Sequence, residues 1–551
     1  MNKIDFSKQR ILIVDDQKPF LALLKSVLNS AGAQANSIVT AKSCEVALAS
    51  CRKEKFDFII CDLHLGSNRK NGFEFLEELR ETSLLKPTTV FVLVSADSQR
   101  PTVLGSLEKQ PDEYVVKPFS QAQLILRLEK AHARKLALAP IYKHIYAKDF
   151  PMAIEVCKQV IQADNRYKEL VGRLLAELYW TTTQFTEAQK WLNSYSEDHK
   201  RTWLGVSKAQ TEMLLKNYEI AIELANHALR KNNLLIEAHD IIAQSWFELG
   251  KIAEAEIAID TALRLSPFSI ERLFKACTYA RKNENYEKII GLTQNIWECS
   301  KKSVYRNLSY LCAHVRSYLE VAQHTSDNKV KGRFQQEALY ALQRYRHNEN
   351  VYIQDEFDFD IFEELIKARI HSQNGKLFQS KQAMTQAQNS VAAKFSDFPL
   401  PLAPDGITAL LDLGEFEDAQ LITEALLASG KLSDCNTLAL LADATGRNNL
   451  QQEHFFKYNQ QGINFYSEGK FAAAFSAFSE AQKSAPVNIG IILNLLQCSL
   501  RLLQKTAKHD PALVNSSKKT YRLLQNMTML DKHRQKFNLL ALELEKIMDI
   551  R

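Results

Sequence analysis

Past residue 140 the chain repeats itself about every 34 residues, and this period constrains most of the fold. Aromatic residues or isoleucine recur with spacings of 35, 33, 34 and 34 residues, at Phe150, Phe185, Tyr218, Ile252 and Tyr286. Three places after each comes a small or aliphatic residue, at Ala153, Ala188, Ala221, Ala255 and Ile289. Apolar residues here follow helical spacing. The period therefore predicts one helical hairpin per copy, stacked on its neighbours.

This pattern resembles the tetratricopeptide repeat (TPR), whose second helix opens with an aromatic residue and then places a small residue at the helix contact. The clearest copy holds Gly462, Phe465, Gly469, Phe471, Ala474, Phe478, Ala481 and Pro486, and the next clearest ends at Pro267. Between them we expect two longer helices over 303–347 and second helices that open near Phe378 and Phe416. Residues 140–551 are thus predicted to form an all-α TPR solenoid of about eight or nine helical pairs, capped by helices at about 518–550.

The resemblance implies that the repeats bind another protein, because the first helices of such arrays line a concave groove. Most of the aromatic and alanine positions are expected in the core. By register, the residues facing the groove are Gln244, Phe247, Asn459, Ile463 and Tyr466. The acidic and aromatic stretch from Asp355 to Asp360 is either a docking patch or, as we favour, a helix N-terminus with inward aromatics.

Residues 1–139 follow a different pattern, in which short apolar runs alternate with helical segments. The runs of strand length lie at 11–14, 37–39, 58–61, 90–94 and 114–116. The helical segments lie at about 19–31, 43–54, 72–80, 101–109 and 120–138. This alternation predicts right-handed crossovers and an α/β doubly wound (βα)5 domain with a parallel sheet.

Polar residues follow four of these strands at the point where each strand ends. They are Asp15, Asp16, Asp62, Ser95 and Lys117. Because the carboxyl ends of parallel strands meet at one edge of a sheet, we expect a single pocket there. Three crowded carboxylates repel one another, so a divalent cation is implied, and Mg²⁺ prefers such oxygen ligands. The implied Mg²⁺, the Lys117 ammonium and the Ser95 hydroxyl beside Asp62 suit phosphoryl transfer to its carboxylate.

Residues 9–138 resemble the CheY-like receiver domain of two-component response regulators. The resemblance implies that Asp62 is the phosphoacceptor and that Asp15 and Asp16 bind Mg²⁺ with the backbone carbonyl of His64. It also assigns phosphate binding and switching to Ser95, Lys117 and Tyr114, and a cis peptide bond before Pro118. The chain departs from the family after Leu65, where Gly66 opens a polar stretch about two residues longer than usual.

Composition limits the remaining function classes. The formal net charge is only +6, and no helix-turn-helix pattern follows residue 140, so we expect no DNA binding. Nine scattered cysteines without a Cys-x-x-Cys pair, and no signal or membrane-span pattern, favour a cytoplasmic protein. We find no pattern of a kinase core, phosphodiesterase or nucleotide loop, and expect no enzymatic activity.

Taken together, these features predict a two-component response regulator. A sensor histidine kinase or phosphotransfer protein would phosphorylate Asp62, and phosphorylation would gate binding of an unidentified protein by the TPR array. The alternative is a phosphate sink or kinase-docking inhibitor that competes with another response regulator. The resemblance also names the face of the fourth and fifth receiver helices as a surface for homodimers.

Overall fold

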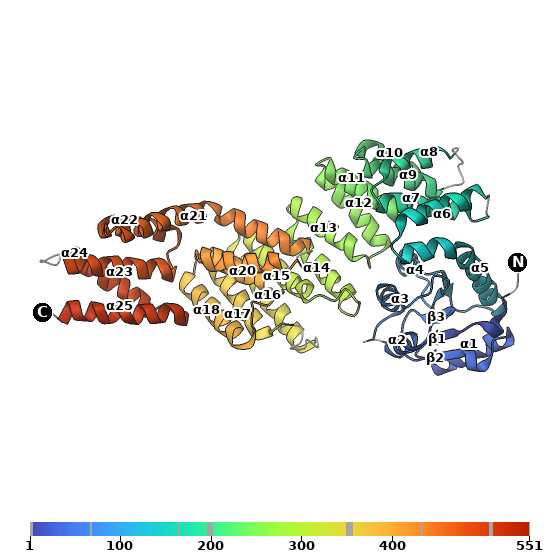
Figure 1. The fold of residues 1–551 in the computed structure, drawn as a ribbon, viewed down its shortest axis with the longest axis horizontal. Coiled ribbons are helices and arrows are strands. Elements are labelled where there is room, and N and C mark those ends of the chain that lie inside the picture. The colour runs from blue at the N-terminus through green and yellow to red at the C-terminus, as the bar shows by residue number, and fades with distance from the viewer. Residues whose placement is uncertain are drawn as a thin grey trace. The chain divides into compact units, whose positions relative to one another are not determined.

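The structure is a computed structural model, shown in Figure 1, and it describes residues 4–66, 69–163, 166–195, 202–348, 356–430, 434–505 and 511–549. It begins with a parallel sheet of five strands in the order β2-β1-β3-β4-β5. The strands are β1 (Ile11–Val14), β2 (Ile38–Ala41), β3 (Phe58–Asp62), β4 (Val90–Ser95) and β5 (Glu113–Val116). Every residue of β1, β3 and β4 is buried, as continuous apolar runs require when helices cover both faces.

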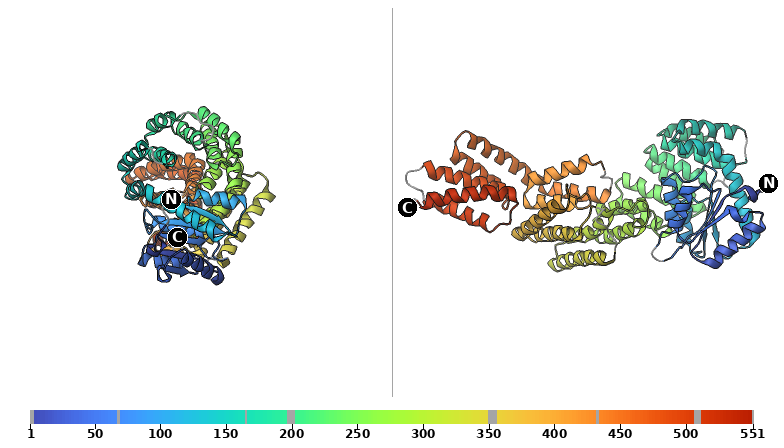
Figure 2. Two further views of the ribbon diagram at one scale, coloured as in Figure 1. Left: turned by 90° about the vertical axis from the view of Figure 1, so that its right-hand side faces the viewer. Right: turned by 60° about the horizontal axis from the view of Figure 1, so that its bottom comes forward.

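Helices lie on both faces of this sheet, as the blue region of Figure 2 (right) shows. The helices are α1 (Lys18–Ser30), α2 (Cys44–Lys53), α3 (Gly72–Glu81), α4 (Arg100–Glu108) and α5 (Gln121–Tyr146). Alternate strand residues separate two cores: Ile11 and Ile13 pack with α1 and α5, and Leu12 and Val14 pack with α2 and α3. The predicted doubly wound order is therefore confirmed, with most element ends within one or two residues of the prediction.

The exception is α5, which continues past the predicted end at Leu138 to Tyr146. Pro140 lies inside the helix, where it removes one backbone donor. Leu138 and Ile141 are nevertheless fully buried, in a core shared with the next two helices. Packing of this apolar face outweighs the local cost of the proline. The predicted boundary between residues 139 and 140 thus falls within one continuous helix, and it stays a prediction.

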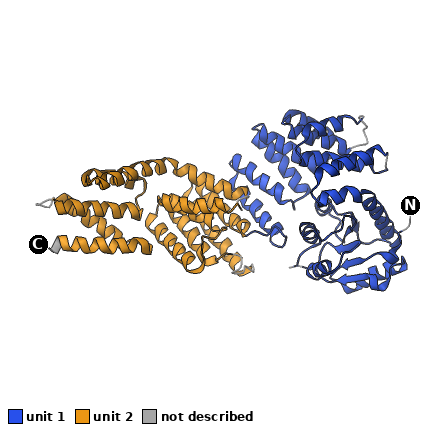
Figure 3. Cartoon of the chain, viewed as in Figure 1, with its two compact units in different colours: residues 1–307 blue, residues 308–551 orange. Residues whose placement is uncertain are grey.

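The chain divides into two compact units after residue 307, well beyond the predicted boundary (Figure 3). Unit 1 is residues 1–307 and unit 2 is residues 308–551. The remaining helices of unit 1 are α6 (Phe150–Gln162), α7 (Lys168–Thr181), α8 (Phe185–Asn193), α9 (Thr202–Leu214), α10 (Tyr218–Lys231), α11 (Ile236–Glu248), α12 (Ile252–Leu265), α13 (Ile270–Lys282) and α14 (Tyr286–Ser300).

All five residues of the 34-residue pattern are the first residue of a helix in unit 1. Two places before each stands a residue with positive φ: Lys148, Thr183, Lys216, Gly250 and Glu284. A left-handed residue reverses the chain direction between the two helices, which is why the turn recurs at a fixed distance from the first residue of the second helix. Glycine adopts this conformation at little cost, whereas the other four residues do so under strain.

The described residues of unit 2 form helices joined by turns and loops, with no strand among them. Its helices are α15 (Leu308–His324), α16 (Asn328–Asn348), α17 (Phe359–Gln373), α18 (Leu377–Lys394), α19 (Ala403–Leu413), α20 (Phe416–Ala428), α21 (Cys435–Ser467), α22 (Phe471–Ser484), α23 (Ile489–Lys505), α24 (Pro511–Gln525) and α25 (Asp531–Asp549). The two longer helices predicted over 303–347 are α15 and α16. Phe416 and Phe471 open helices as predicted, whereas Phe378 is the second residue of α18. The predicted closing helices correspond to the end of α24 and to α25.

Within the stretch from Asp355 to Asp360, residues 356–360 lead into and begin α17. Asp355 lies outside the described residues. The Asp358 side chain accepts hydrogen bonds from the backbone N–H groups of Asp360 and Ile361. Phe357 is buried against Phe362, with ring centroids 5.7 Å apart. The favoured interpretation as a capped helix start is therefore confirmed for residues 356–360. Across the described part of the chain, no helix combines the length and apolar composition needed to cross a membrane.

Candidate functional site

Four polar side chains meet at the carboxyl edge of the sheet in unit 1. Asp15 follows β1, Asp62 ends β3, Ser95 ends β4 and Lys117 follows β5. The β1 and β3 register pairs Val14 with Cys61, so the next residues of both strands reach the edge together. Asp15 is 1% exposed and Asp62 is 7% exposed. The sequence prediction placed these residues in one pocket, and the structure brings them together.

Lys117 bridges the two buried carboxylates. Its Nζ lies 3.1 Å from Oδ2 of Asp15 and 3.1 Å from Oδ2 of Asp62. The ammonium also lies 3.7 Å from the centre of the Phe20 ring, a contact that favours a desolvated cation. The Lys117–Pro118 peptide bond is cis, as predicted. The two ion pairs hold the lysine over the Asp62 oxygen, where it can bind a phosphoryl oxygen.

Three carboxylates form the cluster that could hold a metal ion. Oxygens of Asp15, Asp16 and Asp62 all lie within 4.8 Å of one another. Burial raises the pKa of Asp15, against the backbone hydrogen bond from Gln17 and the charge of Lys117. A raised pKa means that the buried anion lacks full compensation, so a divalent cation fits this oxygen set. The His64 side chain is exposed, and the role of its backbone carbonyl stays a prediction.

The loop after β4 links the pocket to α4 through consecutive hydrogen bonds. The Ser95 hydroxyl accepts a hydrogen bond of 3.0 Å from the backbone N–H of Asp97. Oδ2 of Asp97 accepts one of 2.8 Å from Thr102 in α4. The Tyr114 hydroxyl donates to the backbone carbonyl of Asp97 at 3.0 Å, and its side chain is buried. Ser95 and Tyr114, the two predicted switch residues, thus contact the same loop residue.

A cleft of about 680 Å³ opens over Asp62. Among its lining residues are Asp16, Arg69 and Lys117 of the receiver region. One lining residue, Lys302, comes from the segment that follows α14, far along the sequence. Sequence reasoning missed Lys302 because it belongs to no motif. Arg69 falls in the inserted polar stretch, whose unusual length was its only signal; Ser67 and Asn68 of that stretch lie outside the described residues.

Two of the predicted groove residues, Gln244 and Phe247, lie on α11 of unit 1. The Phe247 ring stacks on the Tyr279 ring with centroids 4.6 Å apart. Gln244 accepts a hydrogen bond of 3.1 Å from the Tyr279 hydroxyl and donates one of 2.8 Å to Glu248. Both side chains remain half-buried and contact the next repeat as well as solvent. Their role in partner binding stays a prediction.

The other three predicted groove residues lie on α21 of unit 2. Asn459 is buried and donates a hydrogen bond of 3.3 Å to Glu417. Ile463 is exposed, and the Tyr466 hydroxyl accepts a hydrogen bond of 2.8 Å from Gln497. Of these three, Ile463 is the side chain most available to a partner.

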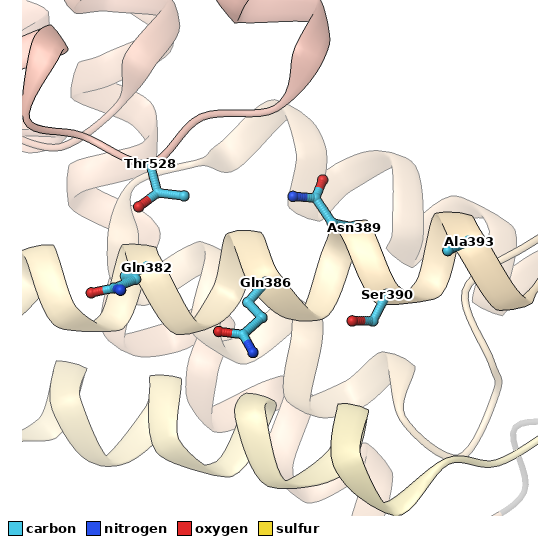
Figure 4. Close-up of a pocket in the computed structure, with 6 residues that line it drawn as sticks. All are labelled: Gln382, Gln386, Asn389, Ser390, Ala393 and Thr528. Atoms are coloured by element: carbon cyan, nitrogen blue, oxygen red, sulfur yellow. The ribbon is translucent and has the colours of Figure 1, made fainter.

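Unit 2 also contains a cleft of about 420 Å³ over α18. Figure 4 shows its lining residues, which are Gln382, Gln386, Asn389, Ser390 and Ala393 along α18, and Thr528 on the segment across from them. Among the described residues, the lining offers amide and hydroxyl groups and no charge. It provides hydrogen-bonding capacity but no group suited to acid, base or metal chemistry.

Comparisons with known proteins agree with the geometry of the edge site. Residues 11–129 match the family model described as response regulator receiver domain. The alkaline phosphatase synthesis transcriptional regulatory protein PhoP of Bacillus subtilis is 33% identical over 132 residues, which is 24% of this chain and 52% of PhoP. The chain thus spans about half the length of the curated relatives it matches.

Solved structures similar to parts of the chain fall into two groups. Chemotaxis response regulator CheY4 of Vibrio cholerae is 26% identical with a TM-score of 0.20, and covers 22% of this chain and 96% of its own. The C-terminal part of a TPR repeat-containing protein from Cytophaga hutchinsonii is 13% identical with a TM-score of 0.32, and covers 46% of this chain and 93% of its own. The family match and the pocket together identify the N-terminal region as a response regulator receiver domain.

Proposed function

We propose that this chain is a two-component response regulator in which phosphorylation of Asp62 gates protein binding by the helical repeats. A sensor histidine kinase or a phosphotransfer protein would supply the phosphoryl group. The observation that carries the proposal is the position of Asp62, whose Oδ2 lies 3.1 Å from Lys117 Nζ within the three-carboxylate cluster. The relative PhoP is named as a transcriptional regulatory protein, whereas here the output is assigned to protein binding.

The chemistry requires one nucleophile and compensation of the phosphoryl charge. A carboxylate oxygen of Asp62 forms a bond to phosphorus, the bond from phosphorus to the donor's imidazole nitrogen breaks, and its electron pair stays on that nitrogen. Lys117 binds a phosphoryl oxygen, and the Ser95 hydroxyl can donate to another while still accepting from Asp97. Asp15, Asp16 and Asp62 would hold Mg²⁺, which would neutralise further charge.

A direct contact between α4 and the repeats supports the proposed gating. The Glu108 carboxylate accepts hydrogen bonds from Arg272 and from the Ser266 hydroxyl. Arg272 is 5% exposed and also donates two hydrogen bonds of 2.7 Å to Asp240. A Cβ added to Gly105 would lie 2.8 Å from the Phe268 ring, so α4 and the repeat are closely packed. Movement of α4 would therefore disturb the repeats.

The same contact bears on the predicted homodimer. The face of α4 that carries Gly105 and Glu108 is occupied by Phe268 and Arg272 of the repeats. A homodimer through this face requires that these contacts open. We therefore place dimerisation after release of α4, as a consequence of phosphorylation.

Two measurements test the proposal on the full chain. Wild-type protein incubated with acetyl phosphate and Mg²⁺ should gain one phosphoryl group, and Asp62→Asn or a metal chelator should prevent it. Affinity capture of cellular proteins with wild type and Asp62→Ala, each with and without the phosphodonor, should yield a protein whose binding changes only for phosphorylated wild type. Equal partners and affinities in all four samples would exclude phosphorylation-gated binding.

A further inference from the structure

The cleft over Asp62 is completed by the helical repeats. Of the eleven described residues that line it, ten fall between positions 16 and 117, within the receiver region, and the other is Lys302. Lys302 lies in the turn after α14 and is half-buried. A basic residue from the repeats therefore lines the same cleft as Asp62, to which a phosphoryl group would be attached.

The turn that carries Lys302 is fixed at several points. The Ser303 hydroxyl donates to the backbone carbonyl of Ser300 at 3.0 Å and accepts from the backbone N–H of Tyr305 at 3.0 Å. The Tyr305 hydroxyl donates to Glu81 at the end of α3, at 2.9 Å. Because residues on both sides of the turn are held, Lys302 is presented to the cleft by ordered backbone and not by a free loop.

The charges around the cleft favour an added anion. Glu74 at the start of α3 is buried, and burial raises its pKa while the charge of Lys302 opposes that rise, which places Lys302 near this end of α3. Lys117 already compensates Asp15 and Asp62. Phosphorylation adds about one to two negative charges at Asp62, and Lys302, which lines the same cleft, is a second cation that can compensate the added charge.

We propose that Lys302 binds the phosphoryl oxygens on Asp62, so that the repeats contact the phosphorylated residue directly. This inference rests on the proposed phosphorylation of Asp62. An ammonium carries three donors on a flexible stem, and can reach a phosphoryl oxygen without displacing Lys117. Lys302 is then a phosphate-binding residue of the receiver site, although it belongs to the repeats and not to the receiver sequence. The repeats respond to phosphorylation at the site itself, in addition to the α4 contact.

The test uses the full chain with acetyl phosphate as donor and Mg²⁺. In the reaction an Asp62 oxygen bonds to phosphorus and acetate leaves with the electron pair of the broken P–O bond. Lys302→Ala should raise the acetyl phosphate concentration for half-maximal labelling about three- to tenfold, as loss of one charge-assisted hydrogen bond predicts. Lys302→Arg should restore it to within about twofold. Lys301→Ala is the matched control, because Lys301 pairs with Glu298 at 2.8 Å and does not line the cleft.

A second measurement reports on the turn that carries Lys302 and requires no phosphoryl transfer. With beryllium trifluoride and Mg²⁺ as a phosphoryl mimic, backbone hydrogen exchange over residues 301–307 should slow in wild type and Lys301→Ala, and not in Lys302→Ala. Absence of labelling in wild type would contradict the proposed function itself. Normal wild-type labelling with an unchanged Lys302→Ala would overturn only the role of Lys302, as would equal losses in Lys302→Ala and Lys302→Arg.

Discussion

Alanine at Gly462 should destabilise unit 2, although alanine is the better helix former. Gly462 is a buried residue of α21, and its added Cβ would lie 2.5, 2.6 and 2.9 Å from three ring carbons of Phe478. That ring is 2% exposed and cannot move without disturbing the core. Overpacking of this kind costs about 1–3 kcal/mol, and the upper half of that range applies to a rigid ring. The gain in helix propensity is only about 1 kcal/mol, so the net loss should be about 1–2 kcal/mol.

Gly446 provides the matched control in the same helix. It is exposed, and an added Cβ would meet no atom within 4 Å. Gly446→Ala should therefore stabilise unit 2 by about 0.8–1 kcal/mol through propensity alone. The two alanine variants should differ by about 2–3 kcal/mol, with opposite signs relative to wild type.

Urea unfolding of the full chain separates the two units by probe. The five tryptophans lie between residues 180 and 297, so their fluorescence reports on unit 1, whereas far-ultraviolet circular dichroism reports on both. Gly462→Ala should lower the midpoint of the dichroism component from unit 2 and leave the fluorescence midpoint unchanged. Equal stability of the two alanine variants would refute the tight contact between Gly462 and Phe478.

Three further predictions concern unit 1. Glu108→Ala should cost about 1.5–3 kcal/mol in local stability, because it removes one charged partner of buried Arg272, and hydrogen exchange in α4 should accelerate accordingly. Burial lowers the pKa of His132. As the pH falls below about 6.5, the unfolded state therefore takes up a proton at this residue before the folded state does, which lowers the free energy of unfolding. The melting temperature of wild type should fall more than that of His132→Leu between pH 7.5 and 5, and the two melting temperatures should change equally with pH above 7.5. Thr183→Gly should raise the free energy of unfolding followed by tryptophan fluorescence by up to about 1 kcal/mol, because threonine at φ 58° is strained.

The receiver could be predicted from its sequence because its signals are local. Each strand is a short apolar run, and each site residue stands where a run ends, so alternation and strand direction suffice to bring Asp15, Asp62 and Lys117 together. The repeats were predictable for the same kind of reason. In the five copies of unit 1 a left-handed turn residue stands two places before the aromatic residue or isoleucine, and Gly250 shows the residue type that the turn favours.

The contacts between the receiver and the repeats could not be predicted in this way. Arg272 reads in sequence as one charged residue on an amphipathic helix, and only the folded chain places it within hydrogen-bond reach of Glu108 and Asp240. The continuation of α5 through Pro140 has the same origin, since burial of Leu138 and Ile141 depends on helices that come later in the chain. Pairings between distant segments leave no periodic trace.

These contacts give phosphorylation two separate connections to the repeats. One connection runs from the pocket through Asp97 and Thr102 into α4. At the other end of α4, Glu108 contacts Arg272 of the repeats. The other is Lys302, which lines the cleft itself. Movement of α4 on phosphorylation would act on the repeats through the first connection, and the proposed Lys302 contact would add an attraction at the cleft itself. If the two act independently, the effects of Glu108→Ala and Lys302→Ala on partner affinity should add within about 0.5 kcal/mol, and a larger discrepancy would show that both work through one movement.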